Sequence, residues 1–126
     1  MKANFFSATA RDLCNGLHRF QTDEFRVAFC QSIKHATCRT HIKQVQRSQP
    51  VPVRSYRWVK SGMRLTVVFS DTITLVKHAF RYAVIYNATQ RHKPLVCYYE
   101  LPPMRKGDTL TLRHNWHRGS LRLEAE

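Results

Sequence analysis

The sequence predicts a mainly β protein, an antiparallel and jelly-roll-like sandwich with a short N-terminal helix. From Met63 onward, short segments of aromatic and β-branched residues alternate with polar, proline- or glycine-containing breaks, which is typical of strands joined by turns. No helical segments alternate with these strands, so the pattern favours an antiparallel sandwich over βαβ units. The chain has 126 residues, 43% of them hydrophobic and 23% charged, which suits a single domain over residues 1–126 with one core.

The first predicted element is a short helix over residues 7–19, which include "SATARDLCNGLH". Ser7 can cap its start, and Gly16 suits the left-handed residue that ends a helix, directly after Asn15. Leu13 and Leu17 are expected on its inner face. We therefore expect helical structure near the N-terminus.

The next segment, "DEFRVAFC", alternates as a strand does. Phe25, Val27 and Phe29 share one side, and the residues between them share the other. We expect this aromatic side to be one face of the strand.

Residues 32–62 are predicted to be a basic, irregular middle segment, because Pro50 and Pro52 interrupt any long element. Between Phe25 and Ser70 there are nine basic residues and no Asp or Glu. Such a run is either a solvated loop or a partner-binding arm. The candidate contact residues in this segment are Lys43, Arg47, Arg54, Arg57 and Lys60.

Five further strands are predicted, in "RLTVVF", "AFRYAVIY", "LVCYYEL", "DTLTLRH" and "SLRLE". The second and third of these suit an antiparallel hairpin. A register that aligns the apolar residues of both faces places Arg81 opposite Glu100, where opposite charges stabilise a sheet. Both faces of this hairpin carry large side chains, so we expect a second sheet over one face and a partial cover, from this chain or another protein, over the other.

The formal net charge is +13, from 21 Lys and Arg against 8 Asp and Glu. This excess favours an acidic partner, which includes protein surfaces, nucleic acid and anionic lipid. The first residues lack the apolar run of a signal peptide or a membrane span, so we expect cytoplasmic synthesis and no membrane partner. The four cysteines are scattered and form no CxxC pair, which predicts reduced thiols without disulfides.

Metal and catalytic sites are not predicted. His35, Cys38 and His41 are spaced three residues apart, but a closed zinc site needs four ligands. His114 and His117 offer only two. No catalytic signature surrounds any cysteine, and the acidic residues include no paired set for acid–base chemistry. We therefore expect no catalytic residues, no metal, no cofactor and no enzyme activity.

Nucleic-acid binding is the alternative from another functional class. Tyr56 and Trp58 lie among Arg54, Arg57 and Lys60, and aromatic and basic side chains together suit a single strand of nucleic acid. The same stretch also alternates like a strand with core aromatics. No helix-turn-helix, zinc-finger or RNP-type pattern supports nucleic-acid binding.

Several segments resemble a family of small tailed-bacteriophage virion proteins. "RDLCNGLHRFQTDEFRVAFC" is similar to the family's opening helix and "DxFKVAL"-type strand, and "TVVFSDTITLVKHAFRYAVIYN", "KPLVCYYEL" and "GDTLTLRHN" are similar to its later strands. The resemblance covers residues 11–31 and 64–115 in the same order. The middle differs, because this chain has "KQVQRSQPVPVRSYRWVK" where the family has a Gly- and Thr-rich stretch.

The resemblance implies a structural component of a phage particle, and most plainly a capsid decoration or cement protein that bridges subunits of the major capsid protein. Such a protein is made in the host cytoplasm and ends on the outside of the virion. A neck, tail or baseplate component is the alternative within the particle. An aromatic strand face or a sheet edge could also mediate a homodimer.

Overall fold

The computed structural model describes residues 4–33, 48–59, 64–77, 80–112 and 121–123. Within these residues the chain forms antiparallel sheets with strand orders β1-β8-β7-β2-β3, β10-β5-β4 and β6-β9. The elements are β1 (Asn4–Phe5), α1 (Thr9–Cys14), β2 (Phe25–Cys30), β3 (Gln49–Pro50), β4 (Val53–Val59), β5 (Arg64–Phe69), β6 (Thr72–Leu75), β7 (Tyr82–Asn87), β8 (Leu95–Glu100), β9 (Thr109–Leu112) and β10 (Leu121–Leu123). The predicted fold class, mainly antiparallel β with a short N-terminal helix, is confirmed.

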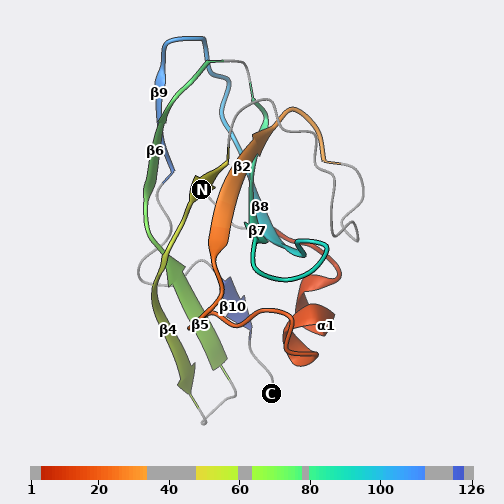
Figure 1. The fold of residues 1–126 in the computed structure, drawn as a ribbon. Helices are drawn as coiled ribbons and strands as arrows, with labels where there is room; N and C mark the ends of the chain where they lie inside the picture. Colours follow the sequence, from red (N-terminus) through yellow and green to blue (C-terminus); the bar gives the residue numbers. More distant parts are fainter. Residues whose placement is uncertain (1–3, 34–47, 60–63, 78–79, 113–120, 124–126) are drawn as a thin grey trace.

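The five-stranded sheet forms one layer, and the other two sheets lie against it as the second. Figure 1 shows β4, β6 and β9 on one side of β2 and β7, and α1 on the other. Val27 and Ile85 of the first layer share a buried cluster with Phe69 of β5 and Leu112 of β9. This common core holds the three sheets together.

The helix is shorter than the predicted 7–19, because α1 runs only from Thr9 to Cys14. Ser7 does not cap it: the N-cap is Ala8, which makes no side-chain cap hydrogen bond. The Thr9 hydroxyl instead donates to the carbonyl of Val96 at 2.6 Å, which ties the helix start to β8. Gly16 has a φ of +73°, so the predicted left-handed stop is confirmed.

Strand β2 has the predicted alternation. Phe25, Val27 and Phe29 lie in the core between the layers. Ala28 and Cys30 lie in a second buried cluster on the opposite face, which also contains Phe6, Val84, Tyr86 and Leu95. The central sheet is therefore buried on both of its faces, and the N-terminal segment supplies part of the second cover.

The β7–β8 hairpin is confirmed, but the predicted register is wrong over most of its length. Tyr86 lies opposite Leu95 as predicted, and a bulge then sets Ile85 opposite Cys97 and leaves Val96 as an extra residue. Beyond the bulge the strands are shifted by one residue, so Glu100 lies opposite Tyr82 and not opposite Arg81. A bulge inserts a residue into one strand, whereas the predicted register kept the same pairing along the whole hairpin.

The middle segment is less irregular than predicted, because β3 and β4 both lie within residues 32–62. Pro50 is tolerated because β3 is at the edge of its sheet. The strand β4 then pairs with β5 along most of its length, with a bulge between Val53 and Ser55. The strand β6 was also missed, since Thr72 falls in a stretch that reads as a polar break between strands.

The register can be checked by engineered disulfides in a background with Cys14 and Cys38 replaced by Ser and with Cys30, which lies opposite Tyr82, replaced by Ala. Tyr82→Cys with Glu100→Cys places two thiols on directly opposed residues, within the reach of a disulfide. We expect this pair to cross-link under mild oxidation, as measured by mass spectrometry after alkylation. The matched pair Arg81→Cys with Glu100→Cys is offset by one residue and should stay reduced; the reverse result would restore the original register.

Candidate protein-docking surface

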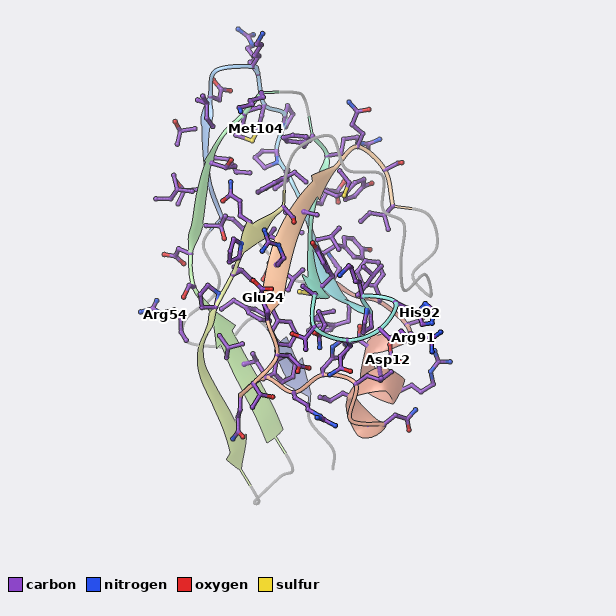
Figure 2. All side chains as sticks on the ribbon, in the orientation of Figure 1. Asp12, Glu24, Arg54, Arg91, His92 and Met104 are labelled. Atoms are coloured by element: carbon purple, nitrogen blue, oxygen red, sulfur yellow. The ribbon has the colours of Figure 1, made fainter. Side chains whose placement is uncertain are left out.

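The structure places two of the five predicted contact residues on one strand. Arg54 is exposed, and Arg57 lies opposite Thr66 in the β4–β5 pairing. The strand β4 is at the edge of its sheet, and Figure 2 shows Arg54 on the outer side of the second layer. Three of the predicted residues lie outside the described part of the chain: Lys43, Arg47 and Lys60.

Among the described residues, two acidic side chains are used inside the fold. Asp12 has no exposed surface and lies 3.7 Å from the Nε of Arg11. Asp23 is half-buried in a hydrogen-bond network. The outer surface is therefore more cationic than the composition alone suggests.

This network centres on Asn87, whose side chain is fully buried. Its Nδ2 donates to the carbonyl of Leu17 at 3.0 Å and to Oδ2 of Asp23 at 2.8 Å. The Nε2 of Gln90 donates to the same carboxylate oxygen at 2.9 Å, and Oδ1 of Asn87 accepts from the backbone N–H of Thr89 at 3.1 Å. The network joins the segment before β2 to the β7–β8 turn, and this is a structural role.

The carboxylate of Asp23 is stabilised in its charged form. Burial by itself would raise its pKa, but hydrogen bonds from Asn87, Gln90 and the backbone of Arg19, together with the charge of Arg19, outweigh burial and hold the pKa below the ordinary value. This carboxylate therefore remains charged at neutral pH and acts as the common acceptor of the network.

The turn held by this network carries three consecutive basic side chains. Arg91, His92 and Lys93 are all exposed. His92 and Lys93 have φ values of 63° and 45°, which residues other than glycine seldom adopt. Figure 2 shows Arg91 and His92 on the side of the molecule that carries α1, opposite Arg54. The turn is a second exposed basic site.

A third basic site lies at one end of the β6–β9 sheet. The backbone N–H of Gly107 donates to the carbonyl of Val76, and the N–H of Val76 donates to the carbonyl of Asp108, both at 2.8 Å. These bonds hold the turn before β9 against the end of β6. The exposed cations gathered here are Lys77, Arg105 and Lys106.

Neither basic turn was singled out from the sequence as a candidate contact site. The stretches "TQRHKP" and "PPMRKGD" were read only as breaks between strands. The clustered cations in these stretches could have indicated contact residues. The candidates were instead chosen in the middle segment, because it has more basic residues and no acidic ones.

The described cysteines offer no reactive pair. Cys30 and Cys97 are buried, and burial raises the pKa of each thiol to about 12, so both are protonated at neutral pH. Cys14 is an exposed free thiol. Within the described residues no group of three or more His, Cys, Asp or Glu side chains could hold a metal ion. The His35–Cys38–His41 group and the His114–His117 pair fall outside those residues.

Comparison with known proteins gives no relative for this chain: no family model, no curated protein and no solved structure matches it. In the described part of the chain, no helix has the length and apolar character needed to cross a bilayer.

Replacement of Asp23 by Asn tests the network. Because the folded-state pKa of Asp23 is lowered, the charged carboxylate stabilises the fold above the unfolded pKa, near 3.8, and this stability is lost as pH falls through the lower folded-state value. Asp23→Asn should reduce the free energy of unfolding at pH 7 by about 1–2 kcal/mol and flatten its decline below pH 5, as measured by urea unfolding from about pH 2.5 to 7.

Asp71→Asn, at an exposed position, is the control and should change stability by less than about 0.5 kcal/mol. Equal effects of both substitutions would contradict the role of Asp23.

Proposed function

We propose that this protein is a non-enzymatic structural component of a tailed-phage virion, which decorates the capsid and bridges subunits of the major capsid protein. The observation that carries the proposal is the distribution of charge. Exposed cations lie on an edge strand, at Arg54, and in two turns of the β-sandwich, while Asp12 and Asp23 make their contacts inside the fold. The resemblance of the strand segments to small virion proteins supports the same function.

Bridging needs separate contact points, and the basic sites provide them. Arg54 and the Arg91–Lys93 turn lie on opposite sides of the molecule (Figure 2), so one copy can touch two neighbouring subunits. Complementary charge speeds the encounter with an acidic shell and sets the orientation. Two modest contacts made by one molecule reinforce each other through effective concentration.

The β4 strand favours a structural reading over nucleic-acid binding. Tyr56 and Trp58 lie in a regular antiparallel pairing, opposite Val67 and Leu65. Residues in such a strand are explained by sheet formation, without a stacked nucleic-acid strand. The buried thiols of Cys30 and Cys97, protonated at neutral pH, likewise give no support to nucleophilic catalysis.

Copy number tests the placement on the particle. Virions of the phage that encodes this chain are compared with virions that lack its gene. We expect the protein in amounts near those of the major capsid protein, by quantitative mass spectrometry, and a lower temperature of shell disruption in its absence. A few copies per particle would indicate a neck, tail or baseplate component. Tighter binding to double-stranded DNA than to empty shells at physiological salt would favour nucleic-acid binding.

Charge reversal on β4 tests the predicted contact residues. Arg54→Glu with Arg57→Glu should weaken re-attachment to shells that lack the protein by about tenfold at low salt, and less at high salt because ions screen the contact. Adding Lys43→Glu, Arg47→Glu and Lys60→Glu should enlarge the effect. The charge-conserving pair Arg54→Lys with Arg57→Lys is the control. Unchanged attachment of the folded Glu variants would remove this segment from the interface.

A further inference from the structure

In strand β6 the usual alternation is reversed: polar side chains face the core and aliphatic side chains face outward. In a strand with one face on the core, the larger apolar side chains normally face inward and the polar ones face water. Here Thr72 and Thr74 are 3% and 8% exposed, whereas Ile73 and Leu75 are 65% and 54% exposed. The strand therefore buries two hydroxyl groups and presents two large aliphatic side chains to the outside.

The orientation of β6 is fixed by its pairing with β9 and by the buried residue that follows it. In the pairing with β9, Thr72 and Thr74 lie opposite Leu112 and Leu110, both of which are buried. Val76 follows β6 directly and is 1% exposed. Together these positions hold the strand in one register, so a one-residue slip cannot turn the aliphatic side chains inward.

The two inward hydroxyls are not equally well placed. The Nε2 of Gln49 donates to Oγ1 of Thr74 at 2.9 Å. The hydroxyl oxygen of Thr72 is buried with no hydrogen-bond partner among the described residues, which is unfavourable. Two large aliphatic side chains exposed on the same face of one strand mark that face as a candidate contact surface for another molecule.

The outer face of the β6–β9 sheet has cations at both ends. Thr109 and Thr111 lie opposite Leu75 and Ile73, so the aliphatic pair is framed by threonines. Figure 2 shows side chains projecting from β6 and β9 away from the body of the molecule, with Met104 near one end. The cations at that end are Lys77, Arg105 and Lys106.

The opposite end of the face is close to the predicted contact strand. The backbone N–H of Ser70 donates to the carbonyl of Pro52 at 2.8 Å, which brings the residues before β6 beside the start of β4 and its exposed Arg54. The outer face of β6–β9 is thus continuous with a basic strand edge at one end and a basic turn at the other.

This charge pattern indicates which kind of molecule can bind the outer face of the β6–β9 sheet. Two copies of this chain, each with a formal charge of +13, would repel, and the cations at both ends of the face would meet cations in a twofold contact. A protein surface with carboxylates around an apolar hollow matches both the aliphatic pair and its basic flanks. We propose that Ile73 and Leu75, flanked by Lys77, Arg105 and Lys106, dock onto such an acidic protein surface.

The identity of that partner as a capsid subunit rests on the proposed function, whereas the choice of surface rests on the inverted alternation. The test begins with folding. Ile73→Thr with Leu75→Thr should leave the midpoint of thermal unfolding within about 3 °C of the wild type, because both side chains are exposed. Leu110→Thr with Leu112→Thr, in the core, is the matched control and should lower the midpoint strongly. Strong destabilisation by the Ile73 and Leu75 changes would show that these side chains are interior, which overturns the inference.

The second measurement is re-attachment to shells that lack the protein. The folded Ile73→Thr, Leu75→Thr variant should need at least about tenfold more protein for half-saturation, whereas Ile73→Val with Leu75→Met should attach normally because both positions stay apolar. Lys77→Gln with Lys106→Gln should weaken attachment most at low salt.

The outcomes separate the two proposals. Normal attachment of the folded Thr variant overturns the docking surface and leaves the proposed function standing. No attachment of the wild-type chain overturns the proposed function and, with it, the partner named here. Binding of the wild-type chain to phosphatidylserine vesicles in place of shells, lost in the Thr variant, would replace the protein partner with a lipid surface.

Discussion

The fold depends on a central sheet that is apolar on both faces. Val84 and Ile85 are neighbours in β7, each has no exposed surface, and they belong to clusters on opposite sides of the sheet. A slip by one residue would exchange two apolar faces, so hydrophobic burial alone chooses weakly between the two registers. Polar groups make the choice between β7 and β2. The buried amide of Asn87, at the end of β7, donates to Leu17 and Asp23 in the segment before β2, and a shift of β7 against β2 would leave these groups without hydrogen bonds.

This ambiguity explains what the sequence could and could not predict. The alternation of β2 and the stop at Gly16 were predicted correctly, because each follows from local chemistry. The Arg81–Glu100 pairing was wrong because the two faces of the hairpin are equally apolar and the bulge at Val96 has no sequence signal. Strand β6 was missed because it has only 4 residues and its first residue, Thr72, belongs to the polar stretch "SDT".

The sequence predicts the cationic character of the candidate site, but only part of its position in the fold. Net charge correctly indicates a cationic surface, and Arg54 is exposed as a contact residue must be. Composition cannot show that Asp12 and Asp23 are engaged in the interior. It also cannot show that hydrogen bonds across Val76 bring Lys77 beside the Arg105–Lys106 turn. Contacts between residues distant in sequence decide which cations act together.

The proposed docking surface also limits the kind of complex that can form. Complete burial of one Ile or Leu side chain stabilises by roughly 1.5–3 kcal/mol, and here each is already partly covered, so the pair contributes about 2–4 kcal/mol. A micromolar complex requires about 8 kcal/mol. The aliphatic pair alone therefore cannot hold an isolated partner, and the remainder has to come from the basic flanks and from a second contact of the same copy. A binder built in this way attaches weakly to one subunit and firmly to an array, because only adjacent subunits supply both contacts at once.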